Sequence, residues 1–525
     1  MPFNISYNLI FQLLFSVLIL FSGMTKGQTT APDSALNNII VSLEGERISL
    51  AQVVELAMKN STSLGKVHTL YMAAEGNLTR QRGYFDPSFY FNIYYNDLDI
   101  PTSSFFAGAD VLQTQETTAQ TGLTLNLPIG TQLELALNTY SLNTNSQFAF
   151  LDPEYNGFGS LSFRQPLLEG FTANGRKDLT FAEFEFDAAK ALYDQEVINI
   201  TSEVEIAYWN LYTAERNYGV QKLVRDRAYE FLIETQLREE AGLVGPEQVA
   251  NAKTFLAEQE ILFIDQEEDL DNKSDELSTI IGIWPEPNSP RFKTTETPPS
   301  EFPIEPVDAM IDYALEANLQ LKAVQDEINA SNTLVDAASW NVLPSLDLLG
   351  SISSSGIGGD SQTIIFGSDT LQTTTSGSFG DMLNQVITRD YPGWSIGVEL
   401  SLPIGFRADI GEKDRLIALT DNVEQRYSEL SREIEKLIRK AHRELLHGNS
   451  RLRAATDGVE AAQEQVRIGR IEFQNGRTTA FELVRLGEDF AKAQRRYSEA
   501  LVRTVNAVAK LKQLTSGKYP GNSNL

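Results

Sequence analysis

The 525-residue sequence contains no cysteine and only three histidines. Without cysteine the chain has no disulfide framework, no thiolate nucleophile and no lipid anchor attached through a thiol. Two of the histidines, His442 and His447, are five positions apart in a helical pattern, which turns them about 140° from each other. A zinc helix needs a spacing of four. We therefore expect no metal, no cofactor and no catalytic residue, and predict that the chain is not an enzyme.

Long apolar runs are also missing. The segment Leu9–Phe21 is apolar apart from Gln12 and Ser16, and it is too short to cross a bilayer as a helix. It fits the apolar region of a secretory signal, so residues 1–27 are predicted to be a signal peptide. The alternative is an N-terminal helix that is buried or frayed. Since no run of 18 apolar residues follows, such a chain is expected to enter a membrane only as a closed β-barrel.

Basic residues are few relative to acidic ones. The chain has 43 lysines and arginines against 71 aspartates and glutamates, a formal net charge of −28. This charge disfavours association with a nucleic-acid backbone or an anionic membrane surface. We expect no nucleic-acid partner.

The sequence does contain a repeated order of elements. In each half a helical segment carries an alanine, Ala57 or Ala314, and a proline follows 30 residues later, Pro87 or Pro344, to open a strand-like run. Further on, each half has a long helical stretch that ends in a glycine turn. The turns follow 72 residues after Gly170 and 71 residues after Gly405. A shared order at a shared spacing indicates an internal duplication.

Alternating segments predict strands. Thr121–Leu127 and Thr131–Asn138 place leucines on one face and Thr, Asn, Gln and Glu on the other, which is typical of a barrel strand. This hairpin, residues 121–138, has no counterpart in the second half; it either folds over the outer rim of a barrel or, as we favour, adds two strands. The Ser/Thr/Gly-rich segment Ser353–Phe379 is predicted to be an exposed loop. Further strands are predicted at Phe85–Tyr94, Ser345–Ile352 and Trp394–Leu402.

The helical segments carry apolar seams. Residues 176–240 lack proline, and a continuous helix of that length would be on the order of 100 Å long. Apolar residues recur every three or four positions in this stretch and in a second helical stretch of the other half, which lets each helix pack against neighbours. The two seams consist of Val197, Ile200, Val204, Ala207 and Leu211, and of Tyr427, Leu430, Ile434, Leu437, Ala441 and Leu445.

Prolines mark the boundary between the repeats. Residues 286–305 form a proline-rich connector, in which helix is blocked and extended chain is favoured. The predicted organisation is therefore a first repeat at 28–285 with its tip near 242–246, a second at 306–517 with its tip near 475–480, and a tail at 518–525.

Taken together, these patterns resemble the TolC family of outer-membrane efflux proteins. The matching segments are Leu50–Leu64, Gln165–Phe171, the turn Glu240–Pro246 and the turn Asn475–Thr479, in the family's order. The resemblance implies a mainly α fold with a transmembrane β-barrel portion. In it, internally duplicated long α-helical hairpins form a trimeric α-barrel tunnel, joined to a β-barrel shared by three subunits.

The resemblance also implies a function and partners. The chain would be a passive homotrimeric duct in the cell outer membrane, in contact with its lipid and with the helical tunnel in the periplasm. It would serve as the exit of a tripartite efflux pump or type I secretion system, coupled through a periplasmic adaptor to an inner-membrane transporter. The implied adaptor-docking residues are Gly242, Leu243, Pro246, Gly476, Thr478 and Phe481. Alternatively, the glycines only turn the chain between antiparallel helices.

Two departures from the family concern the tunnel entrance and its gate. Where well-matched members carry two aspartates, this chain has Glu482 and Arg485, whose opposite charges would offset each other. Where some members lock the gate with a tyrosine, an arginine and an aspartate, the residues here are Phe473, Thr478 and Gln248. Arg477 is a possible substitute, and the same ionic latch is not expected.

Two other functions are weighed against the duct. A periplasm-spanning coiled-coil tether without channel activity would not need the alternating segments that contain Phe89, Tyr90, Tyr94 and Trp394. A general diffusion porin would not devote more of its sequence to helices than to strands.

Overall fold

The computed structural model describes residues 32–366, 369–475 and 477–519. The predicted signal peptide lies outside these residues, as does most of the predicted tail. The chain divides into two compact units, one of residues 32–61, 201–304 and 441–510, the other of residues 62–200, 305–440 and 511–519. Each unit draws on both predicted repeats. In the described part of the chain, no helix is long and apolar enough to cross a membrane.

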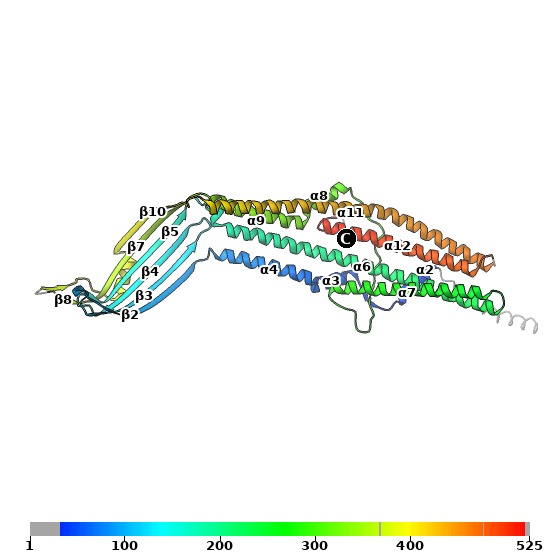
Figure 1. Ribbon diagram of the computed structural model, residues 1–525, viewed down its shortest axis with the longest axis horizontal. Coiled ribbons are helices and arrows are strands. Elements are labelled where there is room, and N and C mark those ends of the chain that lie inside the picture. The colour runs from blue at the N-terminus through cyan, green and yellow to red at the C-terminus, as the bar shows by residue number, and fades with distance from the viewer. Residues whose placement is uncertain (1–31, 367–368, 476, 520–525) are drawn as a thin grey trace, which may run out of the picture. The chain divides into compact units, whose positions relative to one another are not determined.

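The second unit contains a six-stranded antiparallel sheet (Figure 1). Its strand order is β10-β7-β5-β4-β3-β2, so the two strands of the predicted hairpin 121–138 are inner strands. The rim alternative is therefore wrong, and the hairpin adds two strands to the sheet. The strands are β2 (Ser88–Pro101), β3 (Val111–Asn126), β4 (Gln132–Thr144), β5 (Leu151–Pro166), β7 (Ser345–Ser361) and β10 (Tyr391–Ser401).

The loop predicted at Ser353–Phe379 is wrong for much of its length. Strand β7 continues to Ser361, because its backbone still pairs with β5, for example Gly356 with Gly157. Ladder hydrogen bonds join backbone groups, so serines and glycines with no apolar pattern can still pair. A short hairpin follows, of β8 (Thr363–Phe366) and β9 (Asp369–Gln372).

A helix that the sequence analysis did not predict, α10 (Phe379–Thr388), precedes β10. Ser378 caps it: its hydroxyl accepts from the Asp381 N–H, and the Asp381 carboxylate accepts from the Ser378 N–H. This reciprocal box satisfies two backbone donors that a helix start leaves free. Arg389 ends the helix in the left-handed conformation, with φ 59°.

Shorter helices complete this unit. They are α4 (Thr62–Gly83), α5 (Thr172–Gly175), α8 (Val307–Ala317) and α9 (Leu319–Asn341), with the single-turn η1 (Phe105–Ala107). Asn318 caps α9 by accepting from the N–H groups of Gln320 and Leu321, and its amide donates to the Leu514 carbonyl oxygen at 2.9 Å.

The long helices follow the predicted seams. Helix α6 (Lys177–Glu240) is continuous, as expected, and Ile200, Val204, Ala207 and Leu211 are buried along it. In α11 (Arg407–Gln474) the buried residue between Ile434 and Ala441 is Ile438 rather than the predicted Leu437. Both α6 and α11 contribute residues to the two units.

The first unit contains α7 (Pro246–Ile281) and most of α12 (Ala480–Leu514), which form two helical hairpins, α6–α7 and α11–α12, with the later parts of α6 and α11. Helices α2 (Pro32–Ser42) and α3 (Leu50–Asn60) and a parallel pair of strands, β1 (Glu46–Ile48) and β6 (Phe292–Thr294), complete it. Strand β6 lies inside the predicted connector 286–305. The connector is thus more than spacer, because its prolines flank the short run that pairs with β1.

Candidate functional site: a two-faced sheet and two hairpin tips

One row of directly paired residues crosses all six strands of the sheet. Paired residues point to the same face. Every member of this row is apolar, and the exposed fractions of the side chains range from 44% to 78%. The row consists of Phe89, Leu123, Leu135, Leu161, Ile352 and Trp394.

The neighbouring row points to the opposite face, because successive side chains of a strand alternate. All its members are polar: Ser88, Thr124, Glu134, Ser162, Ser351 and Ser395. On the same face the Tyr90 hydroxyl donates to Glu134 Oε1 at 2.9 Å. Arg164 forms an ion pair with Asp347, Nη2 to Oδ2 at 2.6 Å.

The sheet thus has an exposed apolar face and a polar face that carries charge. The alternation predicted for residues 121–138 is confirmed and extends over all six strands. Soluble monomers rarely expose an apolar surface of this extent, whereas strands of membrane barrels do. In the described part of the chain β10 and β2 are the edges of the sheet. Unpaired edges of this kind cannot face lipid.

The predicted turn at the tip of the first hairpin is confirmed. Gly242 has φ +70°, a left-handed conformation that favours glycine. Its N–H donates to the Glu239 carbonyl oxygen, and the Leu243 N–H donates to that of Arg238, both at 2.8 Å. Pro246 is the first residue of α7, where a missing N–H has no cost. The side chain of Leu243 at this tip is 74% exposed.

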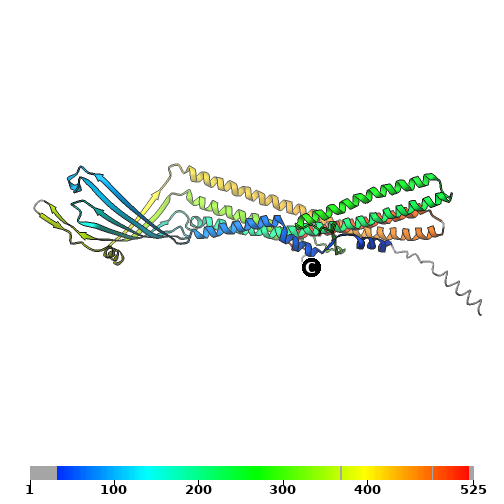
Figure 2. The same ribbon diagram turned by 90° about the horizontal axis from the view of Figure 1, so that it is seen from below.

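The second hairpin turns between Gln474 and Ala480. Gly476 lies outside the described residues. Near this tip the ring of Phe481 on α12 lies 5.8 Å from that of Phe231 on α6, so the two hairpins are in contact. Figure 2 shows the closed ends of the hairpins side by side.

The predicted entrance residues lie on these tips. Glu482 Oε1 and Arg485 Nη2 form an ion pair at 2.5 Å, one helical turn apart on α12. The pair raises the pKa of Arg485. Gln248 and Arg477 are exposed, and Phe473 and Thr478 are half-buried. Among the described residues, Arg477 makes no ion pair.

Residues 310–517 match the family model of the outer membrane efflux protein. These residues are an outer membrane efflux protein domain. The predicted resemblance to the TolC family is confirmed. The domain includes α9, strands β7 and β10 and the whole hairpin α11–α12.

The fold of the chain is that of solved outer-membrane channels. The CmeC channel of Campylobacter jejuni is 14% identical, with a TM-score of 0.59 over 90% of this chain and 87% of that one. VceC of Vibrio cholerae is 14% identical, with a TM-score of 0.59 over 89% of this chain and 96% of VceC. The open-state MtrE channel of Neisseria gonorrhoeae is 14% identical, with a TM-score of 0.58 over 89% of each. No curated relative matches.

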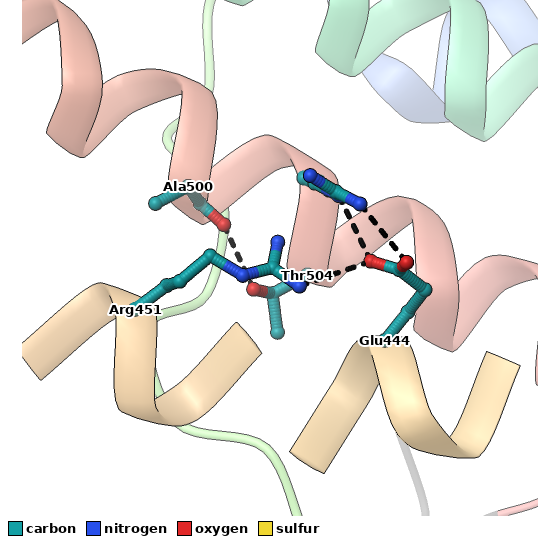
Figure 3. Close-up of polar contacts among 5 residues, drawn as sticks. Glu444, Arg451, Ala500 and Thr504 are labelled. Atoms are coloured by element: carbon teal, nitrogen blue, oxygen red, sulfur yellow. Dashed lines mark hydrogen bonds and ion pairs between the residues drawn. The ribbon is translucent and has the colours of Figure 1, made fainter. Parts of the chain in front are cut away.

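The efflux protein domain contains a charged cluster between α11 and α12 that the sequence analysis did not predict (Figure 3). Glu444 on α11 accepts from Arg451 on the same helix at 3.2 Å and from Arg503 on α12 at 2.8 Å and 2.9 Å. These hydrogen bonds lower the pKa of Glu444, those from Arg503 most. Close by, Gly448 lets the helices approach, because a Cβ there would lie 2.5 Å from Thr504 Oγ1.

A buried carboxyl lies among α6, β6 and α2, outside the efflux protein domain. Glu215 is 2% exposed and accepts from the N–H of Thr294 at 2.6 Å and from its hydroxyl at 2.7 Å. Burial raises the pKa of Glu215 to about 7, although the two hydrogen bonds and Lys293 oppose this shift. Lys293 donates to carbonyl oxygens of α2 and the residue after it, including Ile40 and Leu43.

Proposed function

We propose that three copies of this chain form a passive duct through the outer membrane, the exit of a tripartite efflux pump or type I secretion system. The observation that carries the proposal is the pair of neighbouring rows, one apolar and one polar, across a six-stranded sheet with two free edges. In a closed barrel the apolar row meets lipid, the polar row lines the water-filled passage, and the edges pair between copies.

The proposed barrel is wide. The first half of the chain supplies four strands and the second half two, so three copies of the six-stranded sheet give eighteen. Strands about 4.8 Å apart and tilted by about 40° then enclose a barrel about 36 Å across between backbones. A barrel of this size leaves an aqueous channel.

The hairpins serve the periplasmic side of the proposed duct. The α6–α7 and α11–α12 hairpins of three copies line a helical tunnel, and a periplasmic adaptor docks on their tips and connects them to an inner-membrane transporter. Leu243 and Phe481 support docking rather than turning alone, because both are more than half exposed at the tips. The remaining docking residues in the proposal are Gly242, Pro246, Gly476 and Thr478.

At the proposed entrance the charges of Glu482 and Arg485 offset each other in each copy. The ion pair of Glu482 and Arg485 places both charges at one site. Gln248, Phe473 and Arg477 complete the entrance in the proposal. The tether alternative is not favoured, because it gives the exposed apolar row no role.

The test is single-channel conductance in planar bilayers of protein purified without residues 1–27, with its mass measured in detergent. Two neighbours on β4 supply matched variants: Leu135→Arg on the apolar row and Glu134→Arg on the polar row. A charge facing lipid costs about 2–4 kcal/mol near the bilayer centre. We expect trimers with discrete openings, insertion lost in Leu135→Arg and kept in Glu134→Arg. An unmodified protein that stays soluble and never inserts would favour the tether.

A further inference from the structure

Helix α10 lies on a bed of glycines on the apolar face of the sheet. On β5, Gly159 and Gly157 lie two and four positions from Leu161. On β7, Gly356 lies four positions from Ile352, the partner of Leu161. All three glycines therefore lie on the same face of the sheet as Leu161. A Cβ at any of these glycines would collide with α10, with Met382 or Val386. Only glycine therefore lets a helix lie this close to the strands.

The side chains of α10 divide by polarity. Met382 and Val386, which face the glycines, are 0% and 8% exposed. Phe379 and Ile387 are 44% and 73% exposed. The ring of Phe379 packs edge-on against that of Tyr155, with the ring centroids 5.8 Å apart. The exposed polar residues of α10 are Asp381, Asn384 and Thr388, whereas Gln385 Oε1 accepts from the Ile357 N–H of β7 at 2.9 Å. An apolar stripe on one side and polar residues on the other are typical of a helix at a membrane–water interface.

A groove of about 520 Å³ lies between α10 and the strands. It is lined by Phe89, Leu135, Leu161 and Ile352 of the apolar row and by Leu383 and Ile387 of α10. This volume is in the range of ligand pockets. The groove is continuous with the surface that meets lipid in the proposed duct.

A cation lies at the rim of this groove. Arg389 is exposed and makes no ion pair with any described residue. It precedes β10, whose eleven residues span about 28 Å along the membrane normal at a tilt of about 40°. The apolar band of a membrane barrel is about 25 Å tall. Arg389 therefore lies at the height of the headgroups on the side away from the periplasm.

We propose that α10 lies in the outer interface of the membrane, and that the groove beside it binds one acyl chain of a lipid whose phosphate contacts Arg389. The apolar lining matches the chain, and the unpaired guanidinium matches the anionic headgroup. This inference rests on the proposed function, because the apolar row must face lipid.

The first experiment places single nitroxide labels, which the absence of cysteine makes possible without background mutations. Labels at Ile387→Cys on α10, at Ile396→Cys on the apolar face of β10 and at Ser353→Cys on the polar face are compared in phosphatidylcholine proteoliposomes. We expect oxygen to reach the labels at positions 387 and 396, and a water-soluble nickel complex to reach the label at position 353. If position 396 faces lipid and position 387 faces water, α10 is not an interface helix. If position 396 also faces water, the proposed duct itself is wrong.

The second experiment addresses the headgroup. Protein from vesicles of phosphatidylcholine mixed with phosphatidylglycerol is analysed by native mass spectrometry for retained lipid. An interfacial arginine contributes about a fivefold preference for anionic lipid, and we expect Arg389→Gln to lose it. Arg439→Gln, which removes an exposed arginine of α11, should keep it. Equal retention in the Arg389 variant and the unmodified protein would contradict the site, as would loss in both variants.

Discussion

Glu444 and Arg503 join the two helices of the second hairpin through two hydrogen bonds, Nε to Oε2 at 2.8 Å and Nη2 to Oε1 at 2.9 Å. Arg451 adds a third to the same carboxylate. A bidentate pair fixes the register of α12 on α11 as well as its distance. The side chain of Arg503 is 59% exposed, so water weakens the attraction.

We predict that Glu444→Gln lowers the free energy of unfolding by no more than about 1 kcal/mol. The folded pKa of Glu444 is lowered, so its contribution is present above the ordinary carboxyl value of 4.5 and is lost as pH falls through the folded pKa. Thermal melting at pH values from neutral to acid measures this loss of stability. The control is Glu464→Gln, whose partner Arg467 is on the same helix. An equal loss in both variants would show that the link between helices has no particular role.

The close approach of α11 and α12 at Gly448 predicts a second result. Gly448→Ala places a methyl group against Thr504 and should destabilise the hairpin by about 1–3 kcal/mol. Gly458→Ala on the same helix meets nothing within 4 Å. It should be neutral or stabilising by up to about 1 kcal/mol, as alanine favours helix. Denaturant unfolding of both variants distinguishes them, and equal effects would contradict the packing.

Glu215 predicts a dependence of stability on pH near neutrality. Its folded pKa is about 7, against 4.5 in the unfolded chain. The folded state therefore binds the proton more tightly, so stability falls as pH rises from 4.5 to 7 and is level above that. At 1.36 kcal/mol per pKa unit the loss is about 3 kcal/mol.

Glu215→Gln should remove most of this slope, because an amide can keep both contacts with Thr294 and does not titrate in this range. Melting temperatures of the two proteins across the interval give the comparison. A slope that persists in the variant would assign the pH dependence to other groups.

The ion pair at the proposed entrance predicts opposite effects of two neutral substitutions on ion selectivity. Arg485→Gln leaves Glu482 unpaired and should raise the selectivity for cations, whereas Glu482→Gln leaves Arg485 and should lower it. The double variant should return close to the unmodified protein. Reversal potentials under a salt gradient in planar bilayers measure the ion selectivity of the unmodified protein and of the three variants. Selectivity that ignores every substitution would place the pair away from the ion path.

The sequence predicted what local patterns control. The strict alternation of residues 121–138 predicted both the strands and their faces, and the proline-free stretch 176–240 predicted α6 almost to the residue. The turn at Gly242 was predicted from the glycine at the end of the long helical stretch, and this glycine adopts the left-handed conformation. In each case the signal and the structure lie in the same short segment.

Features that depend on distant partners were missed. Glycines and serines after Ile352 gave no strand signal, because β7 is held there by pairing with β5 and covered by α10. Glu215 and Thr294 are 79 residues apart, so no local pattern shows that the two are hydrogen-bonded. For α10 a signal was present, since Ser378 and Asp381 have the spacing of a capping box.

The most direct test of the account is cross-linking between the free edges of the sheet. In this cysteine-free chain, Ile396→Cys on β10 is combined in turn with Phe89→Cys, Phe91→Cys or Ile93→Cys on β2, and the protein is oxidised in isolated membranes. If three copies close one barrel, at least one combination gives covalent dimers and trimers and nothing larger. Absence of cross-links in every combination, or a ladder that continues beyond the trimer, would contradict closure of the barrel by three copies.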